Sequence, residues 1–224
     1  MDPYSENAFR VLGLPSTATM KDAGRSADRL LKWIELGETA PVRDALPFLG
    51  QLRLDRDKIK RAKREIEEPQ SRIRSELFWL SSDFTHFEPC QKFLREGRYT
   101  DFVAHCEHAI SKEPLPQKAA APKGTHGIVS EEECQAAKAK LPDKGFWPEE
   151  ALAASLARHH LAVFYHSAAI AVSRKTAKSA PGGNLPTANW ELAFRYWLLV
   201  QKDELFWNYL ASRARLLGDA RLKT

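Results

Sequence analysis

The sequence predicts an all-α fold. Apolar residues recur at three- and four-residue spacing in most segments, capping residues precede several of these segments, and no run alternates apolar and polar residues as a strand would. Thirteen prolines and eleven glycines punctuate the periodic segments. With 224 residues, of which 43% are hydrophobic, the chain can form a core in one large domain or two small ones.

The first two predicted helices lie before Gly37. A short apolar helix at residues 7–12 ends in a Gly-Leu-Pro turn, and Thr19 and Asp22 then have the spacing of a capping box that starts a longer helix. The apolar stripe of this second helix consists of Met20, Ala23, Ala27, Leu30, Leu31 and Ile34. Four basic residues lie mostly on its other faces: Lys21, Arg25, Arg29 and Lys32. The exposed side of the helix is therefore expected to be basic.

A long connection and two further helices follow. Residues 38–54 contain two prolines and a glycine, so we expect a connection with room for one helical turn. Helical spacing returns at residues 56–66, where basic residues surround an apolar stripe. Pro69 breaks the pattern, and another helix is expected at residues 71–80.

The second half begins with a predicted helical hairpin at residues 88–111, which turns at Gly97. A stretch rich in proline and glycine then predicts a linker or mobile loop. Later helices are expected at residues 130–141, 149–178, 190–200 and 203–217. Together these features predict four parts: residues 1–82, 83–112, the linker 113–129, and 130–224.

Two runs in the first third, NAFRVLGLPSTATMKDAGRSADRL and IKRAKREIEEPQSRIRSELFW, resemble J-domains, the short helical modules of co-chaperones. The opening matches at Phe9, Leu12, Gly13, Leu14, Pro15 and Ala18, and the closing acidic-Pro-x-x-Arg pattern matches at Glu68, Pro69 and Arg72. The resemblance covers roughly residues 5–80 and implies a J-domain-like helical module at this end of the chain.

The resemblance fails at the tripeptide that gives J-domains their activity. In that family a His-Pro-Asp sequence after the second helix activates the ATPase of a heat-shock chaperone. The corresponding positions here are Glu35, Leu36 and Gly37, and the sequence contains no His-Pro-Asp. A degenerate J-domain is therefore expected, in which the fold is kept and the usual activity is not.

The rest of the chain is similar to tetratricopeptide-like helical regions, which follow J-like segments in a class of bacterial proteins. The run REGRYTDFVAHCEHAI, with Gly97 at its turn and Tyr99 after it, resembles one such repeat, but no clean period of about 34 residues is present. This arrangement also resembles components of bacterial multi-protein systems, including those of stress response and phage defence.

Several histidine and cysteine residues are candidate metal ligands or catalysts. His105, Cys106 and His108 form an H-C-x-H cluster, but neighbouring residues on a helix diverge by about 100°, and a zinc site needs about four convergent ligands. A buried cysteine beside surface histidines is the better interpretation, and no metal or other cofactor is predicted. His159, His160 and His166 are expected in the core or at an interface. The chain has no P-loop, dinucleotide fingerprint, nucleophile elbow or zinc-protease motif, and an enzyme is not expected.

Charge and hydropathy limit the partners. The net charge of +5 arises from 34 basic and 29 acidic residues, which predicts a mixed, mildly basic surface. The strip at residues 55–64 is the best nucleic-acid candidate, but the acids around it favour a solvated helix face. No stretch reaches the roughly 18 apolar residues of a membrane helix, and the N-terminus lacks a signal pattern, so no membrane insertion is predicted. Three cysteines without a disulfide framework suggest a cytoplasmic protein.

Aromatic residues concentrate near the C-terminus. Trp190, Phe194 and Trp197 share one face of a predicted helix, and this pattern indicates either core packing or a groove for a partner. We therefore predict a non-enzymatic adaptor or scaffold that binds another protein. The predicted partner-binding residues are Lys21, Arg25, Arg29, Lys32, Trp190, Phe194, Trp197 and Trp207. The alternatives are a co-chaperone that uses a non-standard loop and a weakly basic nucleic-acid-binding module.

Overall fold

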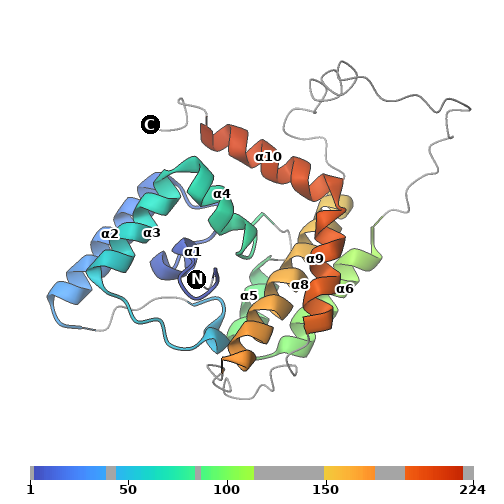
Figure 1. Ribbon diagram of the computed structural model, residues 1–224, viewed down its shortest axis with the longest axis horizontal. Helices are drawn as coiled ribbons and strands as arrows, with labels where there is room; N and C mark the ends of the chain where they lie inside the picture. Colours follow the sequence, from blue (N-terminus) through green and yellow to red (C-terminus); the bar gives the residue numbers. More distant parts are fainter. Residues whose placement is uncertain (1–2, 39–43, 84–86, 114–148, 175–189, 219–224) are drawn as a thin grey trace, which may run out of the picture.

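The protein is described by a computed structural model that covers residues 3–38, 44–83, 87–113, 149–174 and 190–218. Every element of regular structure in these ranges is a helix, which confirms the all-α prediction. Figure 1 shows the N-terminal helices on one side, an upright group of helices on the other, and a last helix crossing above both.

The N-terminal group contains four helices: α1 (Ala8–Leu12), α2 (Met20–Glu35), α3 (Arg56–Glu67) and α4 (Pro69–Leu77). Helices α2 and α3 lie side by side and run antiparallel, so that the end of α2 meets the start of α3, where Glu35 and Arg56 form an ion pair of 3.2 Å. Helices α1 and α4 pack against α3. The described residues of the connection between α2 and α3, 36–38 and 44–55, begin and end at this end of the pair.

Local capping explains where these helices start. The Asn7 side chain accepts a hydrogen bond from the backbone nitrogen of Phe9 and caps α1, which Gly13 ends in the left-handed conformation, φ 63°. The predicted capping box of α2 is present, since the side chains of Thr19 and Asp22 each accept a hydrogen bond from the other residue's backbone nitrogen.

The boundaries of α4 differ from the prediction. Pro69 is the first residue of this helix instead of a break before it, because proline has no N–H to lose at that position and its φ suits a helix start. Glu68 is extended between α3 and α4, as the residue before proline favours. The helix also ends at Leu77, and the prediction that it continues to Leu80 was wrong.

The second group is built around α8 (Glu149–Ser173). The predicted hairpin is present as α5 (Phe87–Arg95) and α6 (Tyr99–Ser111), with Gly97 at φ 71° in its turn. Helix α8 packs against α6 on one side and against α9 (Trp190–Gln201) on another, and it is therefore buried over most of its surface. The last helix is α10 (Glu204–Gly218).

Two elements join the groups. The 3₁₀-helix η1 (Pro47–Leu49) places Phe48 against Tyr99 and Phe164, with ring centroids 5.7 and 5.8 Å apart in edge-to-face geometry. At the other end, α10 packs on both α4 and α8 (Figure 1). The described helices before and after residue 82 thus share one hydrophobic core. The predicted four-part division remains a prediction about the organisation of the chain.

Several predicted features lie outside the described residues. These are most of the linker 113–129, the helix at residues 130–141, Cys134, and the end of the helix at residues 149–178. Among the helices that are described, none combines the length and apolar character that a bilayer-crossing segment requires.

Candidate interaction site

Helix α9 exposes a row of large apolar side chains. Its inner side, with Ala193 and Val200 buried, packs on α8. On its outer side Phe194 is 60% exposed and Leu198 54% exposed, and Trp190 is also exposed one turn earlier. Residues four apart are neighbours on a helix surface, so these three side chains form a continuous line. We call Trp190, Phe194 and Leu198 the α9 ridge.

The ridge is part of a larger apolar area on the α9–α10 hairpin. Within the described ranges, six large apolar side chains are strongly exposed, and Leu36 alone of these lies outside the hairpin. Leu199 and Trp207 are the hairpin members beyond the ridge. The Trp207 indole Nε1 donates a 3.1 Å hydrogen bond to the carbonyl of Gln201, which fixes its ring beside the end of α9. A large exposed apolar area on a protein often marks a surface that binds another molecule.

Trp197 has a different place from the one its spacing predicted. Its side chain is half-buried, and its Nε1 donates to Nδ1 of His166 at 3.1 Å. Rings of Phe78 and His159 also pack against it, with centroids 5.8 and 6.0 Å away. The predicted shared face is therefore divided, with Phe194 directed outward and Trp197 directed into the core. Trp197 supports the ridge from behind, and Leu198, which the sequence analysis did not single out, takes the exposed position.

The predicted basic face of α2 is present but distant from the ridge. Lys21, Arg25, Arg29 and Lys32 are all exposed and lie along one side of the helix. We call these four residues the α2 stripe. A shallow groove of about 450 Å³ runs beside it, between Arg25 and Arg29 and the turn that follows α1. Figure 1 places α2 and α9 at opposite sides of the molecule, so the predicted partner-binding residues form two separate surfaces.

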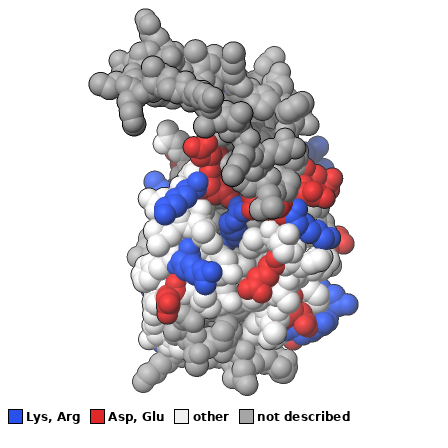
Figure 2. Space-filling view, turned by 90° about the vertical axis from the view of Figure 1, so that its right-hand side faces the viewer, with Lys and Arg blue, Asp and Glu red and all other residues white. Residues whose placement is uncertain are grey.

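The basic strip on α3 is largely neutralised. Lys58 and Arg61 both pair with Glu6, at 3.4 and 2.6 Å, and Arg56 pairs with Glu35. Figure 2 shows a second face of the molecule, on which basic and acidic side chains are scattered over uncharged surface. Nucleic-acid interfaces are much more basic than this, so neither observation favours one.

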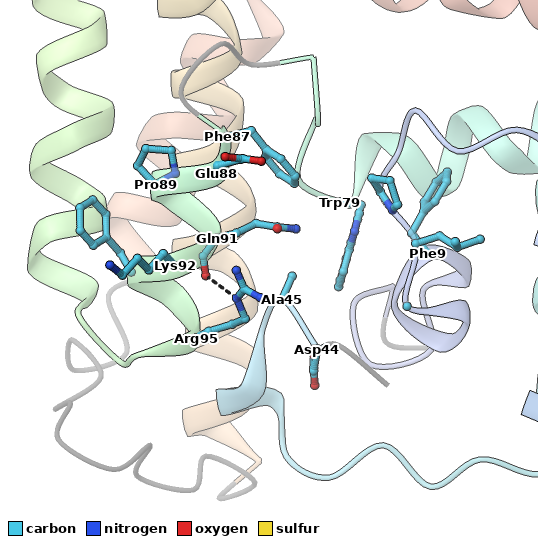
Figure 3. A pocket seen from close by; sticks show the side chains of 14 residues that line it. Phe9, Asp44, Ala45, Trp79, Phe87, Glu88, Pro89, Gln91, Lys92 and Arg95 are labelled. Atoms are coloured by element: carbon cyan, nitrogen blue, oxygen red, sulfur yellow. Dashed lines mark hydrogen bonds between the residues drawn. The ribbon is translucent and has the colours of Figure 1, made fainter. Parts of the chain in front are cut away.

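A cleft of about 790 Å³ separates α1 from α5 (Figure 3). Trp79 and Phe9 line one side, and the α5 residues Gln91, Lys92 and Arg95 line the other. Arg95 is held by a 3.2 Å hydrogen bond from its Nε to the carbonyl of Gln91. The lining thus combines aromatic rings with polar and charged groups.

The histidines on α8 belong to the core, as the sequence predicted for His159 and His160. Nε2 of His159 lies 2.8 Å from the carbonyl of Leu77, and its ring lies 4.7 Å from that of Phe206. Burial lowers the pKa of His159 to about 4 and that of His160 to about 3, so both are neutral at physiological pH. His166 lies at the edge of the core. Its Nδ1 is 2.7 Å from the hydroxyl oxygen of Tyr4.

The cysteines are placed less simply than predicted. Cys106 is buried and His108 is exposed, as expected, but His105 is half-buried. Burial, followed by contact with Cys90, raises the pKa of the Cys106 thiol. The donor atoms of Cys90, Cys106 and His160 all lie within 4.8 Å of one another. No local sequence pattern predicts this cluster, because its members come from three different helices.

No protein-family model matches the chain, and the curated proteins and solved structures also contain no match to it.

Proposed function

We propose that the protein is a non-enzymatic adaptor that binds another protein through the α9 ridge. The observation that supports this function most strongly is the exposure of Phe194, Leu198 and Trp190 on a helix whose other side is firmly packed. Large aromatic side chains contribute most of the binding free energy in many protein interfaces. A rigid helix that presents them loses little conformational entropy when a partner binds.

The geometry of the ridge indicates the kind of partner. Side chains four residues apart along one helix fit an apolar groove on another protein, in the manner of helix-in-groove recognition. Exposed Glu191 and Arg195 flank the ridge and would lie at the polar rim of such an interface. We expect the partner to offer a hydrophobic groove with both signs of charge at its edges.

A scaffold role is supported by the separation of the two surfaces. The α2 stripe is basic and the α9 ridge is apolar, and they lie at opposite sides of one continuous core. Partners of different chemistry can therefore bind without competing. The α2 stripe would attract an acidic protein surface, with an affinity that falls as salt increases.

The ridge is tested by changing Phe194 and Leu198 together to glutamine. The matched control is Leu36→Gln, which changes a large apolar side chain that is 72% exposed at the far side of the molecule. Proteins captured from a lysate of the source organism are identified for the unaltered protein, the double variant and the control. Each captured protein is then purified, and its Kd for each of the three forms is measured. We expect one partner whose affinity falls at least roughly 30-fold for the double variant and is unchanged for the control, because two hot-spot residues contribute about 2 kcal/mol or more. Equal affinity of all three forms for every captured protein would refute this proposal.

A co-chaperone is the second candidate, on the specific observation that an antiparallel α2–α3 pair carries an exposed basic stripe. That arrangement, together with the J-domain resemblance, would allow α2 to dock on an acidic chaperone surface. The residues Glu35, Leu36 and Gly37 at the end of the pair would then replace the missing tripeptide. Stimulation of a cognate heat-shock ATPase, lost on Arg25→Glu, supports this candidate, and unchanged ATPase turnover removes it.

A further inference from the structure

Three metal-ligating side chains meet where α5, α6 and α8 pack together. Cys90 comes from α5, Cys106 from α6 and His160 from α8, and each is completely buried. Their donor atoms lie within 4.8 Å of one another, although residues 90 and 160 are far apart in the sequence. The cluster is outside the α9 ridge, the α2 stripe and the cleft, and the proposed adaptor function makes no use of it.

The hydrogen bond that His160 makes is of the kind found in metal-bound histidines. Its Nε2 lies 3.1 Å from the backbone carbonyl of Ser81, and a carbonyl oxygen only accepts hydrogen bonds. Nε2 therefore carries the proton, and the lone pair of the neutral ring is on Nδ1. A histidine that binds a metal through one ring nitrogen usually donates its other N–H to a backbone carbonyl or carboxylate in this way.

We propose that Cys90, Cys106 and His160 bind one Zn²⁺ ion. As each sulfur–zinc bond forms, the thiol releases its proton to solvent, so binding of one ion releases two protons. Two thiolates and a neutral imidazole balance the charge of a divalent ion. A neutral cluster is the form that an apolar core tolerates, because burial of a net charge is costly. The same donors around a monovalent copper ion would leave a buried negative charge.

The geometry needs little adjustment. Zinc–sulfur bonds of about 2.3 Å and zinc–nitrogen bonds of about 2.0 Å place the donors of a tetrahedral site roughly 3.5–4 Å apart. The observed upper limit of 4.8 Å therefore requires the donor atoms to approach one another by about 1.3 Å at most. Three protein ligands leave one coordination position, which a water molecule can complete.

The test uses the full chain, purified without chelator and reduced, and measures zinc by mass spectrometry of the metal. We expect one zinc per chain, together with a thiolate-to-metal charge-transfer band after replacement by Co²⁺. The zinc is lost in Cys90→Ala and Cys106→Ala and retained in His108→Asn, a control on the exposed side of α6. The Phe194→Gln/Leu198→Gln variant retains zinc as well, so failure of the adaptor proposal and failure of this one are distinguishable.

A cysteine variant could lose zinc because it does not fold, so the unaltered protein provides a second readout. Addition of Zn²⁺ to the metal-free chain is expected to raise the unfolding temperature. A metal-free chain whose unfolding temperature is unchanged by Zn²⁺ overturns the proposal. A disulfide between Cys90 and Cys106 in the chain purified without reductant, or full zinc content in the Cys90→Ala/Cys106→Ala double variant, overturns it too.

Discussion

Arg213 and Glu76 form a two-point ion pair between α10 and α4. Nε of Arg213 donates to Oε2 of Glu76 at 2.7 Å, and Nη2 donates to Oε1 at 2.9 Å. The same carboxylate accepts a 3.0 Å hydrogen bond from Nε of Arg72, whose Nη2 also donates to the carbonyls of Ser16 and Ala18. One buried carboxylate therefore holds two guanidinium groups and attaches the hairpin that carries the α9 ridge to the N-terminal helices.

The first prediction concerns this carboxylate. Glu76→Gln keeps the shape of the side chain but leaves Arg72 without an anionic partner in the core, and breaking a buried ion pair on one side costs about 3 kcal/mol or more. We expect the free energy of unfolding in urea to fall by roughly that amount. Glu67→Gln is the matched control, because Glu67 pairs with Lys63 at 3.8 Å on the exposed side of α3 and should cost less than about 1 kcal/mol. Equal losses for the two variants would contradict the assigned role of Glu76.

The polar network separates the features of the fold that local sequence patterns encode from those that they do not. The helices were predictable because capping and apolar spacing act within a few residues, as the Thr19–Asp22 capping box illustrates. Arg72 belongs to the acidic-Pro-x-x-Arg pattern, whereas Arg213 and Glu76 resemble ordinary surface charges in the sequence. Their burial depends on α10 crossing α4, a long-range contact that no local pattern encodes.

The second prediction concerns two glycines of the α2 region. Gly24 lies inside α2, and a Cβ added there would meet no other atom within 4 Å. Gly24→Ala should therefore stabilise the protein by roughly 0.5–1 kcal/mol, since alanine restricts the unfolded chain and favours helix.

The control for that prediction is Gly37→Ala. The space around Gly37 is equally open, but its φ of 73° is strained for a residue with a Cβ. This variant should be destabilised by about 1 kcal/mol. Thermal unfolding of both variants checks the pair, and a stabilising Gly37→Ala would contradict a left-handed backbone at this turn.

The third prediction is a loss of stability at alkaline pH through Tyr209. Burial, more than any other cause, raises the pKa of its phenol, and the nearby Asp83 carboxylate, 2.7 Å away, raises it further, while Arg213 acts in the opposite direction. The unfolded chain loses this proton near pH 10, whereas the folded protein keeps it to higher pH. The contribution of Tyr209 to stability is thus complete below about pH 10 and decreases as the pH rises above it.

Tyr209→Phe isolates this effect from other alkaline titrations. We expect the free energy of unfolding of the variant to depend less steeply on pH above about 10, by up to roughly 1.4 kcal/mol per pH unit. Chemical unfolding at a series of alkaline pH values measures the two slopes. Identical slopes would mean that Tyr209 ionises equally easily in both states.

The candidate site was predictable in outline and not in detail. The density of tryptophan and phenylalanine near the C-terminus indicated an aromatic surface, and Phe194 is exposed as such a surface requires. Spacing alone could not decide which side of α9 faces α8. That choice depends on Ala193 and Val200, which allow α9 to approach α8 closely and turn Trp197 inward with them. For the same reason, the exposure of Leu198 could be assigned only from the packing of α9 against α8.

The α9 ridge itself can be tested by site-specific photo-crosslinking in the source organism. A photoreactive amino acid is placed at position 194 in one form of the protein and at position 36 in another, so that both probes are exposed and replace apolar side chains. We expect the probe at 194 to crosslink to one partner protein, to which the probe at 36 does not crosslink. Crosslinking of the same proteins from both positions, or of none from position 194, would contradict it.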